Sequence, residues 1–241
     1  MGMFDDAEGI VKRQMVLFFI VDCSGSMNGT KIGAVNQAIR DVIPELQDAG
    51  GSDVDLKVAC LKFSSGCEWM YPSPIASENF SWQNLDADGV TDFGTACEEL
   101  NKKLSRHEFL NAPSASVAPA LFLMSDGEPT DNYQSGLAKL QGNKWFQNAI
   151  KVAVAIGVDA NKEVLKEFTG NSEAVITVHT PEALKKWIRA VSVTSSKIGS
   201  QSQPMTDGQI QTKQDAVIDE IKDIQQSDAD LSQTSTSGDD W

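Results

Sequence analysis

Histidine and paired cysteines are scarce in this chain. Only 2 histidines occur among 241 residues, and the 4 cysteines form no CxxC pair and no metal-ligand spacing with histidine. This composition excludes a zinc site of the finger or ribbon kind and offers no regular framework of disulfides. We interpret the cysteines as reduced thiols of a cytosolic protein.

Long apolar runs are also missing. No stretch approaches the roughly 18 apolar residues that are needed to span a bilayer. Lys12 and Arg13 precede an apolar run over 15–21, which superficially resembles the start of a signal peptide. The run stops at Asp22 without a small-residue cleavage pattern, so we predict a cytoplasmic protein.

Basic charge is in deficit. The chain has 34 Asp and Glu residues against 20 Lys and Arg residues, which gives a formal net charge of -14. A surface of this sign repels phosphates and anionic membranes, so nucleic acid and membrane partners are disfavoured. A cation or a basic partner fits the charge better.

The hydrophobic pattern predicts alternating strands and helices. Continuous apolar runs typical of buried strands alternate with amphipathic stretches, and a Gly-containing turn at 64–66 joins two short strands into an antiparallel hairpin. The predicted class is α/β, a doubly wound, mainly parallel six-stranded sheet with one antiparallel edge strand. Strands are expected at 16–21, 53–63, 67–71, 118–124, 151–157 and 174–178, and helices at 30–46, 95–104, 162–168 and 181–193.

The composition divides the chain into three parts. Residues 1–14 are predicted to be an N-terminal lead-in, 15–197 the folded domain, and 198–241 an acidic flexible tail rich in Ser, Gln, Asp and Thr. Within the tail, the apolar residues of 216–224 are spaced for one short amphipathic helix, which would dock on the domain or on a partner.

Oxygen-bearing side chains follow the two most apolar strands. The first strand ends in DCSGS and the fourth in SDGEPTD, while the long loop between them carries Thr91. Ligands of open parallel sheets bind beyond the carboxyl ends of the strands. Carboxylates and hydroxyls without His or Cys suit a hard divalent cation, so we predict an Mg²⁺ site, which Mn²⁺ or Ca²⁺ would also fit. The candidate ligands are Asp22, Ser24, Ser26, Thr91 and Asp126.

Several simpler interpretations stay open. The two serines could cap the helix that follows them, although Thr91 and Asp126 favour the metal site. Asp92 either supports the metal indirectly or is a solvated loop residue, which is the simpler interpretation. Strand alternation directs Cys23 away from the metal side and into the core. The aromatic residues near the metal loop either form an apolar rim for a partner or are buried under the loop: Tyr71, Trp82 and Phe93.

These motifs resemble the von Willebrand factor A domains that carry a metal-ion-dependent adhesion site. The DxSxS motif, the distant threonine in GVTDFG and the second aspartate in LMSDGEPTD occur in the family's order, and the resemblance spans roughly 14–197. It implies that the serines and the threonine coordinate the metal and that the aspartates act mostly through water. The sequence departs from the commonest pattern in having Val90 before the threonine and Asp92 after it.

A narrower resemblance rests on three segments, VDCSGSM, AVNQAI and SDGEPTD. They are similar to those of the bacterial tellurite-resistance TerY-like subgroup. That resemblance implies a cytosolic module encoded with a serine/threonine protein kinase and a metal-dependent protein phosphatase. A tellurite or stress response and one of these two enzymes as the partner are therefore expected.

Two functions follow from the predicted site. In the first, a non-enzymatic binding or scaffold module grips an acidic residue of a partner protein through its metal. In the second, an Mg²⁺-dependent hydrolase or phosphatase uses a metal-bound water. The three loops contain no histidine, no GxxxxGK motif occurs, and no arginine adjoins the ligands. We therefore predict a binding module and not an enzyme.

Overall fold

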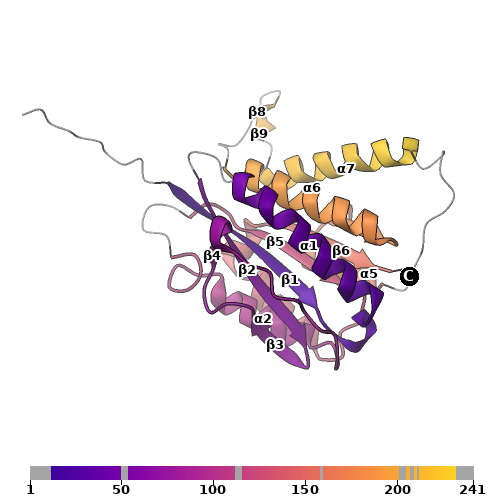
Figure 1. Cartoon of the computed structure of the whole chain (residues 1–241). Helices are drawn as coiled ribbons and strands as arrows, with labels where there is room; N and C mark the ends of the chain where they lie inside the picture. Colours follow the sequence, from indigo (N-terminus) through magenta and orange to yellow (C-terminus); the bar gives the residue numbers. More distant parts are fainter. Residues whose placement is uncertain are drawn as a thin grey trace, which may run out of the picture.

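Five parallel strands form the centre of the sheet. The computed structural model describes residues 12–49, 54–111, 116–157, 160–200, 205–206, 209–210 and 212–231. The strand order is β3-β2-β1-β5-β6-β7, and β3 and β4 both run antiparallel to β2 (Figure 1). The strands are β1 (Arg13–Asp22), β2 (Val54–Ser64), β3 (Gly66–Trp69), β4 (Ile75–Ala76), β5 (Ala120–Ser125), β6 (Ile150–Ile156) and β7 (Val175–Val178).

Helices cover both faces of this sheet. One face packs against α1 (Thr30–Ala49) and α6 (Pro181–Ser200), and α7 (Lys213–Leu231) lies along α6 (Figure 1). The other face carries α2 (Phe93–Lys103), α3 (Tyr133–Gln141), α4 (Lys144–Gln147) and α5 (Lys162–Thr169). The shorter elements are the 3₁₀ turns η1 (Gly25–Met27), η2 (Ser77–Asn79) and η3 (Ser172–Ala174), and the two-residue strands β8 (Met205–Thr206) and β9 (Gln209–Ile210).

The central strand β1 shows why the sheet is covered on both sides. Its side chains alternate between the two cores: Leu17 and Phe19 pack with the α1 and α6 side, whereas Phe18 and Ile20 pack with the α2 and α3 side. All four are at most 1% exposed. Burial of each such side chain contributes about 1.5–3 kcal/mol, so continuous apolar strands require two helical layers.

The α/β class and the mainly parallel sheet are confirmed, with some differences in detail. β4 adds a two-residue strand beside β2, which is too short for a sequence pattern to indicate. β1 begins at Arg13, inside the predicted lead-in, because its first residues pair with Val54 and Asp55. The predicted lead-in and tail lie partly outside the described residues, which include neither 1–11 nor 232–241.

The helix predicted near 216–224 forms as α7. Val217, Ile218 and Ile221 are buried, and α7 packs mainly against α6, so the described part of this helix docks on the domain. No helix among the described residues is long and apolar enough to cross a membrane.

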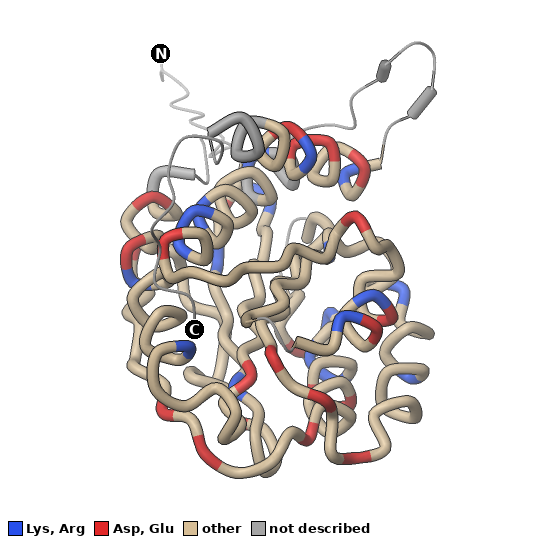
Figure 2. The backbone as a smooth tube through the Cα atoms, turned by 90° about the vertical axis from the view of Figure 1, so that its right-hand side faces the viewer, with Lys and Arg blue, Asp and Glu red and all other residues tan. Residues whose placement is uncertain are grey.

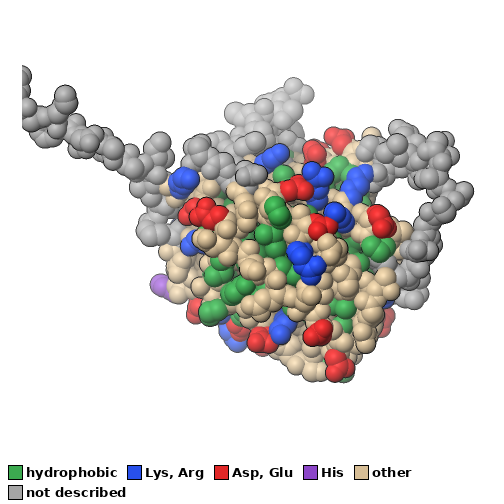
Figure 3. All heavy atoms as spheres, viewed as in Figure 1, with side chains coloured by type: hydrophobic (Ala, Val, Ile, Leu, Met, Phe, Trp, Pro, Cys, Tyr) green, Lys and Arg blue, Asp and Glu red, His purple; other side chains and the backbone are tan. Residues whose placement is uncertain are grey.

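Charged side chains are interspersed over the α1 and α6 face of the molecule (Figure 3). Arg189 of α6 pairs with Glu45 of α1 at 2.6 Å, and Lys185 pairs with Asp41 at 2.5 Å. Water screens exposed pairs of this kind, so the helix pair is held mainly by the apolar residues beneath it.

Candidate metal centre

The ends of β1 and β5 lie side by side. The two strands are parallel neighbours and their register pairs Val21 with Met124, so the polar residues after each strand emerge at the same edge of the sheet. This arrangement is the one that brings ligand residues from separate loops together in open α/β sheets.

Asp22 is the most deeply buried member of this group. It is 0% exposed, and its carboxylate accepts hydrogen bonds from the Ser24 backbone N–H at 2.8 Å and from the Ser125 hydroxyl at 2.6 Å. Burial raises the pKa of Asp22 above its ordinary value of 3.8, although the hydrogen bonds from Ser125 and Ser24 lower it. The site therefore holds a carboxylate whose charge is incompletely compensated by the protein.

Ser24 and Ser26 turn their hydroxyls toward one another and toward the second aspartate. The two Oγ atoms are 3.0 Å apart, and Ser26 Oγ donates to Asp126 Oδ1 at 2.8 Å. Ser24 precedes the short turn η1 and makes no side-chain capping hydrogen bond there. Its hydroxyl therefore does not cap this turn.

Two hydrogen bonds join Thr91 to Thr130, and we call this pair of bonds the clasp. The Thr91 N–H donates to Thr130 Oγ1 at 3.0 Å, and the Thr130 N–H donates to the Thr91 carbonyl at 2.9 Å. Thr91 is buried, and the clasp ties its loop to the loop that follows β5. Thr130 could not be predicted from the sequence, because a threonine in a turn-rich segment carries no signal for this role.

Gly127 reveals a space enclosed by three loops. A Cβ atom placed on Gly127 would lie 3.4 Å from Asp22 Oδ2, 3.4 Å from Thr91 Oγ1 and 3.5 Å from Ser26 Oγ. We call the oxygen-lined space in front of Gly127 the cradle. Two buried carboxylates and three hydroxyls are an oxygen donor set suited to a hard divalent cation, so these residues fit a metal of that kind.

The cradle contains few carboxylates. In the described ranges, no group of three or more His, Cys, Asp or Glu side chains is placed to hold a metal ion. Only two of the five candidate ligands are acidic. A metal held here would depend on the hydroxyls.

The comparisons with known proteins identify the family of this chain. The model of the von Willebrand factor type A domain matches residues 17–190, which is most of the chain. The chain belongs to the von Willebrand factor type A domain family. Domains of this family generally mediate protein interaction or adhesion through a metal site. No curated protein sequence matches the chain significantly.

Solved structures share the von Willebrand factor A fold with this chain. A von Willebrand factor type A protein from Catenulispora acidiphila is 22% identical with a TM-score of 0.56, and the match covers 77% of this chain and 43% of that one. The pilus adhesin SpaC from Lactobacillus rhamnosus GG is 17% identical with a TM-score of 0.59, over 79% and 30% of the two chains. This chain thus spans less than half of either protein.

A third structure is described with a metal. Proximal thread matrix protein 1 from the mussel byssus, with a zinc-occupied adhesion-site motif, is 15% identical to this von Willebrand factor A domain with a TM-score of 0.56. The match covers 78% of this chain and 46% of that one. At this identity, the likeness shows the shared fold alone.

Asp92 holds a turn of the von Willebrand factor A domain in place. Its carboxylate accepts from the Gly66 N–H at 2.7 Å, and its own N–H donates to the Ser64 carbonyl at 2.8 Å. The interpretation of Asp92 as a solvated loop residue is therefore wrong, because its carboxylate fixes the β2–β3 turn. Asp131, which the sequence analysis did not single out, accepts from the backbone N–H groups of Gly94 and Thr95 at the start of α2.

The aromatic residues of the long loop pack beneath it. Phe93 is buried in the core on the α2 side, and Trp82 donates to Asn36 Oδ1 at 3.0 Å while packing against Phe19. Tyr71 donates to the Ser81 carbonyl at 2.7 Å. Among the described residues, the large hydrophobic side chain that is exposed is instead Val90, at 46%.

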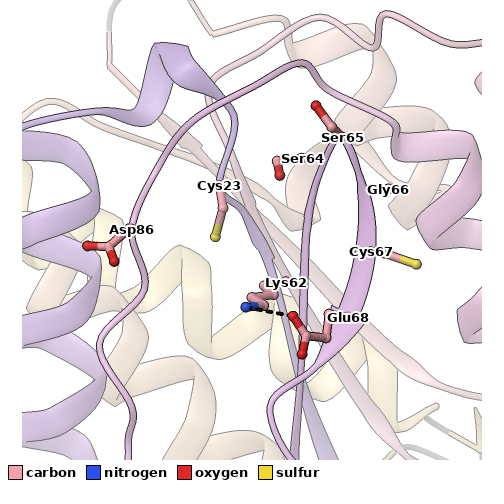
Figure 4. Close-up of a pocket in the computed structure, with 8 residues that line it drawn as sticks. All are labelled: Cys23, Lys62, Ser64, Ser65, Gly66, Cys67, Glu68 and Asp86. Atoms are coloured by element: carbon pink, nitrogen blue, oxygen red, sulfur yellow. Dashed lines mark ion pairs between the residues drawn. The ribbon is translucent and has the colours of Figure 1, made fainter.

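A polar pocket of about 250 Å³ opens between the long loop and β2–β3 (Figure 4). Cys23 points into it, and Lys62 and Glu68 form an ion pair on its wall, as Figure 4 shows. Cys23 is also buried with the core residues on the α1 and α6 side, as strand alternation predicts. Burial raises the pKa of Cys23 to about 12, so this thiol stays protonated.

Proposed function

We propose that this domain is a metal-dependent protein-binding module that grips an acidic residue of a partner. In this proposal the metal ligands are Asp22, Ser24, Ser26, Thr91 and Asp126. The observation that carries the proposal is the cradle, in which oxygen atoms of Asp22, Ser26 and Thr91 face one space in front of Gly127, while Asp126 accepts a hydrogen bond from Ser26. A divalent cation bound there can coordinate the carboxylate of a partner.

The donor set favours Mg²⁺ as the ion. Hydroxyls are neutral, so they leave more of the charge of the cation available to a partner than direct carboxylates would. Mn²⁺ and Ca²⁺ accept the same oxygen donors. Zinc in the adhesion-site motif of the mussel protein supports a site of this kind that takes more than one divalent ion.

The surroundings of the cradle suit a protein partner. Val90 exposes an apolar side chain next to Thr91, where it can contact a partner held at the metal. In the view of Figure 2, acidic positions follow one another along the lower loops, whereas most basic positions lie on helices. The partner in this proposal therefore offers one carboxylate within an otherwise neutral or basic surface.

Partner identity and location follow from the narrower resemblance. A serine/threonine kinase or a metal-dependent phosphatase of a bacterial stress system, such as tellurite resistance, is the first partner to test. The binding unit is the domain over 15–197, with 198–241 as its tail. Free thiols at all four cysteines support a reducing, cytoplasmic location.

An Mg²⁺-dependent hydrolase or phosphatase is the alternative function. It needs a general base beside the metal-bound water. The side chains that converge on the cradle are hydroxyls, two carboxylates and Lys31, which pairs with Asp126. Both carboxylates already accept hydrogen bonds, so this set favours binding over hydrolysis.

Calorimetric titration with Mg²⁺ and with Mn²⁺ tests the proposal directly. We expect binding to the unaltered protein and loss of binding in Asp22→Ala and Ser24→Ala. Ser135→Ala is a matched control, because Ser135 is exposed on α3. Unchanged affinity in both cradle variants would contradict the metal assignment.

Binding of the candidate kinase or phosphatase is a separate test. It should require Mg²⁺ and fail in EDTA, and metal-independent binding would support a plain scaffold instead.

A further inference from the structure

Lys31 contributes a cation to the cradle from within the chain. It is the second residue of α1, and its ammonium group forms an ion pair with Asp126 Oδ2. The other oxygen of the same carboxylate, Oδ1, accepts from the Ser26 hydroxyl at 2.8 Å. Both oxygens of Asp126 are thus engaged by the protein itself.

This ion pair is more buried than typical surface pairs of the same chain. The side chains of Lys31 and Asp126 are 21% and 2% exposed, whereas those of Lys62 and Glu68 are 40% and 72% exposed. Water screens a pair weakly at this depth, so the charge of Lys31 acts strongly on its neighbours. Its partner is the buried carboxylate of Asp126. Burial and, to a smaller extent, the charge of Asp126 raise the pKa of the buried Asp22, and such carboxylates are costly to keep charged without a counter-ion.

We propose that Lys31 is a built-in counter-ion that holds the metal-free cradle together and keeps its affinity for a divalent cation low until a partner carboxylate arrives. The inference rests on the proposed function of the site. A divalent cation in the cradle meets an Asp126 carboxylate that Lys31 has already partly neutralised, and it is repelled by the ammonium group. A partner carboxylate offsets this excess of positive charge, so metal and partner strengthen each other's binding.

The coupling gives the site a regulatory property. Linkage between two ligands is reciprocal. The factor by which bound metal raises the affinity of the domain for the partner is therefore the factor by which bound partner raises its affinity for the metal. Lys31 lowers the affinity of the free domain for the metal, so filling of the cradle depends more on a bound partner. The module would then engage metal and acidic partner together.

The test is a metal titration of variants that change only the charge at position 31. Lys31→Met keeps an unbranched apolar side chain without the ammonium group, and Lys31→Arg keeps the charge. We expect Mn²⁺ and Mg²⁺ to bind Lys31→Met about tenfold more tightly than the unaltered protein, since a neighbouring like charge is removed. Lys31→Arg should bind as the unaltered protein does. Lys139→Met serves as a surface control, because Lys139 forms an exposed pair with Glu98.

Melting temperatures give a second readout that does not depend on a partner. Without metal, Lys31→Met should melt at a lower temperature than the unaltered protein, and saturating Mg²⁺ should raise its melting temperature by more. Lys31→Gln provides a second neutral variant if Lys31→Met does not fold. Unchanged or weaker metal binding in a folded neutral variant would overturn the inference, as would tighter binding in Lys31→Arg.

The outcomes separate this inference from the proposed function. If the unaltered protein binds metal and the neutral variants bind it no more tightly, only the role of Lys31 is contradicted. Absence of metal binding in the unaltered protein and in every variant contradicts the metal site and, with it, the inference. Binding that becomes measurable only in the neutral variants supports the inference.

Discussion

The hydroxyl of Ser26 donates a hydrogen bond of 2.8 Å to the carboxylate of Asp126, which lies 100 residues further along the chain. This bond joins the loop after β1 to the loop after β5, and it connects two candidate ligands. A hydrogen bond between two ligand side chains restricts their rotamers, which lowers the entropic cost of binding.

Filling the cradle with a methyl group should weaken metal binding. In Gly127→Ala the new Cβ would sit 3.4–3.5 Å from three oxygens of the cradle, in ordinary contact but in the space that a cation and its waters need. We expect affinity for Mg²⁺ to fall by about tenfold or more with little change in melting temperature. Gly33→Ala, where no atom lies within 4 Å of the new Cβ, is the matched control. Equal affinity in both variants would show that the cation binds elsewhere.

The raised pKa of Asp22 predicts how pH changes the stabilisation by metal. Burial favours the protonated form, so the stability contributed by this group is present in full below about pH 3.8 and is lost as pH rises through its higher pKa in the folded protein. A divalent cation favours the ionised form. The increase in melting temperature caused by Mg²⁺ should therefore be larger at pH 7 than at pH 5.

A neutral isostere of Asp22 checks this prediction. Asp22→Asn should melt at pH 7, without metal, at least as high as the unaltered protein, because no charge is buried. It should also gain nothing from Mg²⁺. A clear drop in its metal-free melting temperature would contradict burial as the source of the shift in the pKa of Asp22.

Removing the clasp on Thr91 should affect the metal more than the fold. Thr130→Val removes the hydroxyl that accepts from the Thr91 N–H, while the backbone bond from Thr130 N–H to the Thr91 carbonyl can remain. We expect a loss of about 1 kcal/mol in the free energy of unfolding and a severalfold loss of Mg²⁺ affinity. Thr95→Val, at an exposed position on α2, should change neither, and calorimetry with denaturant melts would measure both quantities.

Thiol reactivity should be low throughout the native protein. Burial raises the pKa of Cys23 to about 12 and that of Cys67 to about 11, and it also raises the pKa of Cys60 and of Cys97. Alkylation proceeds through the thiolate, so iodoacetamide at pH 8 should modify none of the four within minutes, whereas all four should react in urea. Mass spectrometry measures the difference. Fast labelling of Cys23 in the native state would indicate that its pocket activates the thiol.

The order of strands and helices could be predicted because local pattern determines it. The runs around Phe19 and Leu123 are apolar throughout, which is the signature of strands covered on both faces. Element ends were less predictable. α2 begins at Phe93, two residues before the expected start, where Asp131 satisfies the first free N–H groups of the helix. Such a cap comes from a distant loop and leaves no local signal.

The sequence by itself determined the α/β class, the family and the five candidate ligands. The spacing of apolar residues and each ligand motif involve residues close together in the chain, so they can be recognised without the fold. The use of those ligands for a metal remains a prediction. Only the tertiary structure decided which side chains surround them: Lys31 on Asp126, Thr130 on Thr91 and the open space in front of Gly127. These contacts join residues that are far apart in the chain, and their strength depends on burial and distance, which arise only when the loops after β1 and β5 meet.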